Sequence, residues 1–244
     1  MDQASVDDLY EKGFLSPAIE KVRESYKSTY RKSFEEAETA SGVAQLLVMG
    51  AGADRYIPHQ MASLVFFHKL VRSCQAAILL CERGLIVDAQ TLCRSAVEAL
   101  FHAVALINDP SVFVRMCRAG DIEDRKQAKA MIKSLAELGL SEKNIQDLNE
   151  VISRAEGEGA GFSTFEAAQV AGLIPLYETM YRGLSSVASH ATFRSMDSSL
   201  LVRDGEPVLI TGPTDYHLEF TLGILKTCLD ISSNRLRDSF VFEE

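Results

Sequence analysis

With 244 residues, of which 47% are hydrophobic and 24% charged, the chain can bury a substantial core, and its composition is typical of a folded protein. Its 25 basic and 34 acidic residues give a formal net charge of -9, which disfavours a protein dedicated to binding duplex DNA. The five cysteines are odd in number and form no C-x-x-C pair, so they indicate reduced, buried thiols rather than a disulfide framework or a zinc site. We therefore expect neither a metal nor a cofactor.

The sequence also bears on where the protein is found. Residues 1–8 are acidic and contain no basic leader with an apolar run, so no signal peptide is predicted. The most apolar stretch, residues 85–107, is long enough to cross a bilayer, but ionisable side chains inside a bilayer are costly and argue against a membrane span. These side chains are Asp88, Arg94, Glu98 and His102. We expect a cytoplasmic protein.

The N-terminal part of the chain is predicted to be polar. Residues 1–15 are interpreted as a mobile or loosely docked leader. Ser16 followed by Pro17 is a typical helix start, and a polar helix is predicted from there to about Ala40. The basic residues of this helix precede its acidic residues, which is typical of a solvated helix face, with a binding arm as the alternative. The glycines within residues 50–53 end the apolar run that follows.

Two apolar helices joined by a tight turn are predicted at the centre of the molecule. The first opens at Pro58 and ends near Arg83, with Gly84 just past its C-terminus. Its apolar residues recur at spacings of three and four, as one buried helix face requires. The second helix spans residues 86–107 and ends at the Asn-Asp-Pro sequence of residues 108–110. Their short connection predicts an antiparallel pair.

The C-terminal half is predicted to be helical, with one β-hairpin. The further helices are expected at residues 111–138 (one helix, or two with a break at Gly120), from 141 to about 155, at 175–191 and at 214–238. Residues 156–161 are rich in glycine but lack the Gly-Lys-Ser/Thr ending of a phosphate-binding loop, so they predict a flexible loop. Asp204-Gly205 between apolar runs predicts a hairpin at about residues 200–210, and Pro207 places its second strand at a sheet edge.

Together these elements predict an all-α fold, a multi-helix bundle with an antiparallel central helix pair and one small β-hairpin near the C-terminus. We expect an N-terminal leader and polar helix at residues 1–56. A helical core domain is expected to follow at residues 57–244.

The second central helix carries a stripe of polar residues. At about 100° per residue they fall on one side of the helix, and they are Asp88, Thr91, Arg94, Ser95, Glu98 and His102. Arg94 can pair with Glu98, and Glu98 can pair with His102, because each pair is four residues apart. A carboxylate beside an imidazole raises its basicity, as a general base or a metal ligand would need. The alternative is that this stripe faces solvent or the polar groups of a neighbouring helix.

A second polar motif lies on the helix predicted at residues 175–191. It contains Tyr181, Arg182 and Ser185, followed by Ser189 and His190. Ser185 and His190 are five residues apart, which points them poorly at one another, and no nucleophile-elbow pattern surrounds the serine, so we reject serine-hydrolase chemistry. A packing or capping role is the alternative for His190. The candidate ligand-binding residues are Arg94, Glu98, Tyr181, Arg182, Ser185 and His190.

The Arg94-x-x-x-Glu98 pattern and the later segment at residues 181–190 resemble an uncharacterised bacterial family of helical domains. The resemblance covers about residues 60–240. It implies an all-helical fold and brings no established activity. The residues that it marks as important are Arg94, Glu98, Ser185 and His190.

The sequence is also similar to the HEPN superfamily, helical bundles that include metal-independent ribonucleases of toxin and antiphage systems. Their active site pairs an arginine with a histidine a few residues later, across a dimer. In this chain, seven residues separate Arg94 from His102 and Arg182 from His190, a longer spacing than is usual there. The resemblance implies that His102 or His190 acts as acid or base on the ribose 2′-hydroxyl and that Arg94 or Arg182 holds the phosphate.

The sequence leaves three functional hypotheses open, and it does not decide whether the protein is an enzyme. The favoured one is a regulatory domain whose polar pocket binds a protein partner or a small polar ligand. The second is a HEPN-like endoribonuclease of a defence or toxin–antitoxin system, with RNA as its substrate and His102 and His190 as catalytic residues. The third is a network that only stabilises the fold. A homodimer is expected in each case.

Overall fold

The computed structural model describes residues 2–52, 57–135, 139, 141–154, 161–185, 199–203 and 205–242. Its helical segments are α1 (Gln3–Lys12), η1 (Gly13–Leu15), α2 (Ile19–Thr29), α3 (Arg31–Gly50), α4 (Pro58–Cys81), α5 (Ile86–Asn108), α6 (Ser111–Leu135), α7 (Glu142–Arg154), α8 (Thr164–Val170), α9 (Ile174–Leu176), η2 (Tyr177–Tyr181), α10 (Arg182–Leu184) and α12 (Leu218–Ser239). The strands are β1 (Ala51–Gly52), β2 (Leu200–Arg203), β3 (Glu206–Leu209) and β4 (Val241–Phe242). The predicted all-α fold is therefore confirmed.

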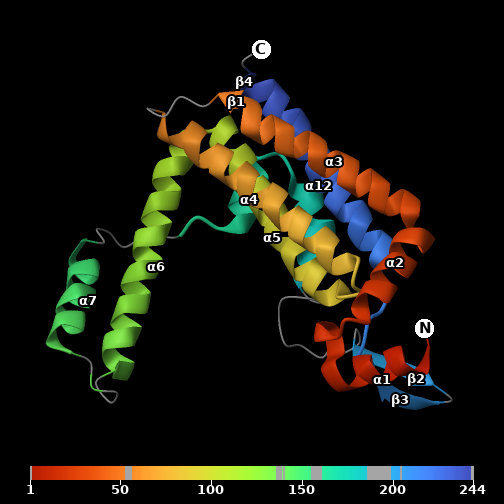
Figure 1. Ribbon diagram of the computed structural model, residues 1–244. Helices are drawn as coiled ribbons and strands as arrows, with labels where there is room; N and C mark the ends of the chain where they lie inside the picture. Colours follow the sequence, from red (N-terminus) through yellow and green to blue (C-terminus); the bar gives the residue numbers. More distant parts are fainter. Residues whose placement is uncertain are drawn as a thin grey trace.

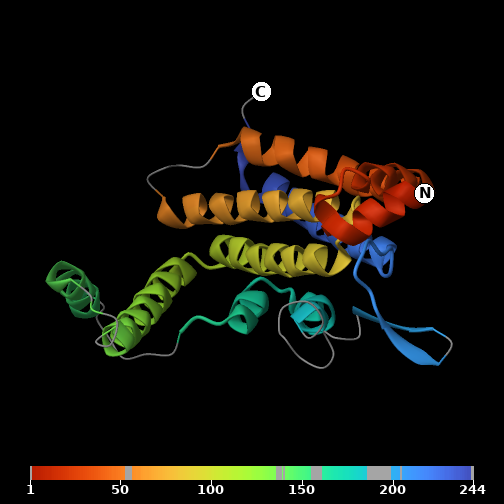
Figure 2. The same ribbon diagram turned by 60° about the horizontal axis from the view of Figure 1, so that its bottom comes forward.

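The helices α3, α4 and α5 lie in successive layers, with α12 beside them and the short segments α8 to α10 along the outer side of α5 (Figure 1, Figure 2). Their facing sides form one apolar core. Almost fully buried side chains come from each layer, for example Phe34, Phe67, Phe101 and Leu225. Because α3 shares this core, it packs together with the segment that was predicted as the core domain.

The predicted central pair is formed by α4 and α5, which run side by side from a tight turn at Gly84 (Figure 1). Gly84 has φ +75°, in the left-handed region that favours glycine. The chain that leads into α12 closes over this turn, where the Thr214 N–H donates to the Gly84 carbonyl at 3.2 Å. Further along the pair, the buried Ser63 hydroxyl donates to the Ala103 carbonyl at 2.9 Å.

The N-terminal segment differs from its prediction. Residues 1–15 were predicted to be a loose leader, but α1 and η1 occupy most of this segment. The Asp2 side chain caps α1 by accepting from the Ser5 N–H at 2.9 Å, and the Lys21 ammonium of α2 bonds to both Asp2 and Ser5 at 2.8 Å. These bonds attach the segment to α2, and its helical structure was not predicted. The polar helix predicted next is interrupted at Tyr30, which separates α2 from α3.

Helices α6 and α7 pack on each other and extend away from the bundle (Figure 1). Of the two alternatives for residues 111–138, the structure has a single helix, which continues through Gly120 to Leu135. Glycine is tolerated inside a long helix at a modest cost, so it need not mark a break.

The predicted β-hairpin is present, with β2 and β3 antiparallel and Leu200 opposite Leu209. It projects from the bundle as a two-stranded sheet (Figure 2). A second, very short pair joins β1 to β4, at the ends of α3 and α12, and the sequence did not predict it. The helix predicted at residues 175–191 is seen as α9, η2 and α10, and its last part lies outside the described residues.

Among the described residues, α4 is the one helix that by length and composition could cross a membrane. Core helices of soluble proteins have the same length and composition. In this structure α4 packs between α3 and α5, and Phe67, Leu70, Val71 and Cys74 are fully buried there.

Candidate functional site

The polar stripe of α5 is covered by protein along much of its length, because α8 and η2 pack against α5. Asp88, near the start of the helix, is exposed, whereas Arg94, Glu98 and His102 are partly buried. Exposure to solvent, one part of the alternative interpretation of this stripe, therefore describes Asp88, whereas Arg94, Glu98 and His102 face neighbouring segments of the protein.

Helix α8, which the sequence did not predict, is fixed at its start by a capping box. The Ser163 hydroxyl accepts from the Glu166 N–H at 3.2 Å, and the Glu166 carboxylate accepts from the Ser163 N–H at 2.9 Å. Arg115 of α6 forms an ion pair with Glu166 at 2.6 Å. These contacts hold Thr164, the first residue of α8, against Glu98 of α5.

Arg94 contacts Tyr181 of η2 in two ways. Its Nη2 donates to the Tyr181 hydroxyl at 2.5 Å, and the guanidinium carbon lies 4.4 Å from the centre of the tyrosine ring. The second contact is a cation–π interaction, which is strengthened where water is excluded. The buried Nε of Arg94 has no hydrogen-bond partner among the described residues. The guanidinium is therefore well positioned but incompletely bonded within this part of the chain.

Glu98 is held more loosely by three groups. Its carboxylate lies 3.6 Å from Nη1 of Arg94, and it accepts from the Tyr181 hydroxyl at 3.3 Å and from the Thr164 hydroxyl at 3.5 Å. These distances are at or beyond the upper end of ordinary hydrogen bonds. The side chain of Glu98 is 36% exposed, so its oxygen atoms remain accessible to another donor. Burial raises the pKa of Tyr181, so its hydroxyl stays protonated and can donate at neutral pH.

Tyr181 belongs to a π-helical turn between the α-helical residues of α9 and α10. Tyr177 stacks on Tyr181 with ring centroids 5.2 Å apart, and Phe101 of α5 meets the Tyr181 ring edge-on at 6.1 Å. The aromatic packing leaves Tyr181 only 8% exposed, with its hydroxyl at the polar stripe of α5. Isolated π-helical turns are rare and occur frequently at functional sites.

His102 lies in an aromatic slot rather than beside a hydrogen-bonding partner. Its ring centroid is 5.3 Å from that of Phe66 in α4 and 5.9 Å from that of Phe162. Its Nδ1 is buried and has no hydrogen-bond partner among the described residues. The predicted hydrogen bond between Glu98 and His102 is not formed. Burial lowers the pKa of His102, and the Glu98 charge opposes this effect only in part.

This pKa shift predicts a pH-dependent stability. The folded pKa of His102 lies below the ordinary value of 6.5, so the unfolded chain takes up the proton first as the pH falls. We expect the free energy of unfolding to decrease between about pH 7.5 and pH 5.5, and we expect His102→Phe to reduce this decrease. Urea denaturation at both pH values measures it, with a change of the exposed His68 to Gln as the control. An equal decrease in wild type and His102→Phe would contradict the assignment.

Two of the remaining predicted site residues, Arg182 and Ser185, do not join the cluster. The side chain of Arg182 is 64% exposed and bonds to Glu178 at 2.8 Å, so it points away from Arg94. Ser185 is partly buried and makes no hydrogen bond to Arg94, Glu98 or Tyr181 within the described residues. His190 and Ser189 lie outside the described residues. Thr164 and Phe162 were missed, because nothing in their own sequence pattern places them beside α5.

Four of the five cysteines are buried in the core, as their pattern predicted, and Cys117 is exposed. Burial raises the pKa of Cys81 and of Cys228 to about 12, which keeps these thiols protonated and unreactive. Within the described part of the chain, no group of three or more histidine, cysteine, aspartate or glutamate side chains could hold a metal ion.

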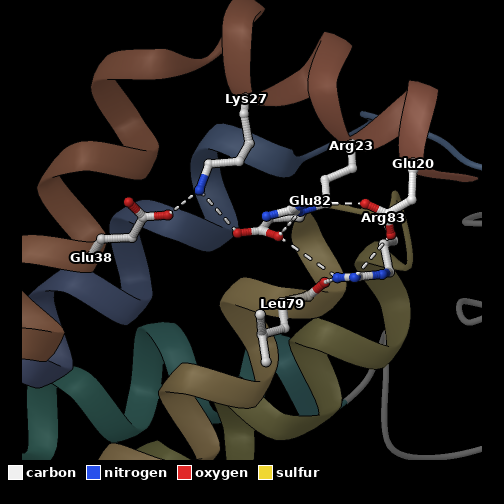
Figure 3. A network of polar contacts seen from close by, with 7 residues as sticks. All are labelled: Glu20, Arg23, Lys27, Glu38, Leu79, Glu82 and Arg83. Atoms are coloured by element: carbon white, nitrogen blue, oxygen red, sulfur yellow. Dashed lines mark hydrogen bonds and ion pairs between the residues drawn. The ribbon is translucent and has the colours of Figure 1, made fainter.

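A second polar network surrounds Glu82, which follows the end of α4 (Figure 3). Its side chain is 4% exposed and forms ion pairs with Arg23 at 2.6 Å and Lys27 at 3.1 Å, both from α2. Glu38 of α3 pairs with the same lysine at 2.6 Å. The basic residues of the predicted polar helix thus have different surroundings. Arg23 and Lys27 bond to a buried carboxylate, whereas Arg31 and Lys32 are on the solvated face.

The fold and the cluster define a helical bundle protein with a half-buried polar site on one face of its central helix. The chain belongs to a family of unknown function (DUF5677), whose model matches residues 60–207. This match confirms the resemblance to an uncharacterised family and includes Arg94, Glu98 and Tyr181. No curated protein and no solved structure matches the chain. The likeness to the HEPN superfamily stays a prediction.

Proposed function

We propose that the protein is a regulatory binding domain whose site is the cluster of Arg94, Glu98 and Tyr181. The chemistry of the cluster suits a small polar ligand that carries a hydrogen-bond acceptor beside a donor, as a primary carboxamide does. The acceptor would bond to the guanidinium of Arg94, and the donor would bond to the carboxylate of Glu98. The expected homodimer and the cytoplasmic location accompany this proposal as predictions.

The observation that carries the proposal is the incomplete bonding of Arg94 and Glu98. A network that evolved only for stability would satisfy its buried groups, because an unsatisfied buried polar group costs about 1–3 kcal/mol. Here the Nε of Arg94 has no partner within the described residues, and each contact of Glu98 is long. The cluster therefore keeps hydrogen-bonding capacity that a ligand could use.

The π-helical turn supports the same proposal. It positions Tyr181 so that one hydroxyl accepts from Arg94 and donates to Glu98, which orients both charged groups. Such a turn is less favourable than a continuous α-helix and tends to be retained where it places a functional side chain. Orientation of a site by an aromatic hydroxyl is a form of preorganisation, which reduces the cost of binding.

The ribonuclease alternative is less well supported by the geometry of α5. Arg94 and His102 are eight residues apart, which separates them by about 12 Å along a helix axis. His102 is held between two aromatic rings, and burial lowers its pKa, which disfavours the protonated form that a general acid needs. RNA cleavage is therefore one of the outcomes that the following experiment distinguishes.

The proposal is tested by measuring binding and stability in the same variants. We expect acetamide or L-glutamine to bind saturably in ligand-observed NMR, and we expect Glu98→Gln and Arg94→Gln to weaken that binding about tenfold. Because the contacts of Glu98 are long, Glu98→Gln should change the free energy of unfolding by less than about 1 kcal/mol. Arg182→Gln, which removes an exposed guanidinium of α10, is the matched control and should bind as wild type does.

Three results would contradict the proposal. If Glu98→Gln lowers the free energy of unfolding by about 1–3 kcal/mol and wild type binds no carboxamide, the cluster is a purely structural network. Equal binding in Arg94→Gln and wild type would place the ligand elsewhere. Metal-independent RNA cleavage that is lost in His102→Ala would favour the ribonuclease alternative.

A further inference from the structure

A small cavity lies between α5, the segment η2–α10 and the start of α12. Its volume is about 180 Å³. Most of its lining is apolar, and its lining residues include Gln90, Met180, Leu184, His217, Phe220 and Ile224. None of them belongs to the Arg94 cluster, so this is a separate space with different chemistry.

Gln90 is the polar group of this cavity. Its side chain is buried, with the residue only 4% exposed, and its Nε2 donates to the Thr221 hydroxyl at 3.2 Å. The Thr221 hydroxyl in turn donates to the His217 carbonyl at 2.8 Å. This chain of hydrogen bonds fixes the orientation of the amide, and the amide oxygen is an acceptor that this chain of bonds does not use. The cavity thus combines apolar walls with one positioned polar group, which is typical of a small-molecule site.

The backbone of His217 is strained at the edge of this cavity. Its φ is +65°, and within the described residues it is the one residue other than glycine with a positive φ. Such a conformation costs about 1–3 kcal/mol, and residues held in it cluster at active sites and ligand-binding sites. It places the His217 ring between Tyr216 and Phe220, with ring centroids at 3.9 Å and 6.0 Å. Phe220 is 59% exposed, so an aromatic group borders the cavity where it meets solvent.

We propose that this cavity binds a single aromatic ring that bears a hydroxyl or amino group. The size fits, because an engineered apolar cavity of about 150 Å³ holds one benzene molecule. The ring would pack against Met180, Leu184 and Ile224, and the rings of His217 and Phe220 would cover it through edge or offset contacts. Its hydroxyl or amino group would donate to the amide oxygen of Gln90. The Arg94 cluster takes no part in this recognition.

The proposal is tested with phenol and benzene as probes, titrated into the full-length protein and followed by protein-observed NMR. Phenol should bind saturably and more tightly than benzene. Gln90→Met removes the amide at nearly constant volume, and we expect it to weaken phenol binding about tenfold while it leaves benzene binding unchanged. Ile224→Phe fills the cavity, and we expect it to abolish the binding of both probes.

Ile231→Phe is the matched control, because it enlarges a partly buried residue two turns further along α12 that does not line the cavity. It should retain the binding of both probes. The proposal is overturned if wild type does not bind phenol, or if Ile224→Phe still binds it. Arg94→Gln should leave phenol binding intact whatever its effect on carboxamides, so this proposal and the proposed function can fail independently.

Discussion

Gly84→Ala should destabilise the protein by about 3 kcal/mol or more, measured as the free energy of unfolding in urea. Two penalties combine at this turn between α4 and α5. The φ of +75° costs a residue with a Cβ atom about 1–2 kcal/mol. A Cβ at this position would also lie 2.8 Å from Cβ of Pro213 and 2.9 Å from the backbone nitrogen of Thr214. The chain that leads into α12 would have to move, and its hydrogen bond to Gly84 would be lost.

The control for this prediction is Gly172→Ala, in the turn between α8 and α9. Gly172 also has a positive φ, of +70°, but a Cβ added there meets no atom within 4 Å. Its substitution should cost only the backbone penalty of about 1–2 kcal/mol. The difference between the two variants therefore measures the close approach of residues 213–214. Equal losses of stability would show that this approach is not tight.

Gly84 also illustrates which parts of the fold the sequence can predict. The glycine follows a periodic apolar run and precedes another, so a tight helical hairpin follows from local chemistry alone. The Asp-Gly pair of the β-hairpin is a signal of the same kind. The pairing of Arg94 with Glu98 could be expected for a similar reason, since both residues lie on one face of one helix.

The rest of the site depends on contacts between distant segments. Thr164 reaches Glu98 only because α8 is held against α5, and no local pattern predicts that packing. Tyr181 reaches Arg94 through a π-helical turn, which has no recognised signal in the amino-acid sequence. Arg182, its neighbour, looked equally suitable and points to solvent instead. Because this turn is π-helical, the spacing of a regular α-helix does not predict which of two adjacent side chains faces α5.

The ion pairs of Glu82 show that the contacts of charged residues are also difficult to predict from the sequence. The acidic and basic residues of α2 and α3 look alike in sequence, and most of them are solvated. What distinguishes Arg23 and Lys27 is that α2 crosses the end of α4, where Glu82 is buried (Figure 3). A buried carboxylate needs partners, since its desolvation is costly. The fold therefore brings two basic residues of α2 into contact with a buried carboxylate, and the other charged residues of this helix stay near solvent.

Glu82→Gln should accordingly destabilise the protein by about 2–3 kcal/mol at pH 7. Breaking a fully buried ion pair costs about 3–5 kcal/mol. We expect less here, because Arg23 and Lys27 are about a third exposed and keep second partners in Glu20 and Glu38. Urea denaturation measures the loss. The control is Glu35→Gln, which removes an exposed pair with Arg31 and should change stability by less than about 0.5 kcal/mol.

The pH dependence of the stability difference between wild type and Glu82→Gln distinguishes a loss of charge from a loss of packing. Burial alone would raise the pKa of Glu82, but the hydrogen bonds from Arg23 and Lys27 outweigh it and hold the pKa below the ordinary value of 4.5. The carboxylate therefore adds stability above pH 4.5, and this contribution is lost as the pH falls through the folded pKa. The stabilities of wild type and Glu82→Gln should converge in acid. A difference that stays constant down to about pH 3 would mean that Glu82 acts through its shape and not through its charge.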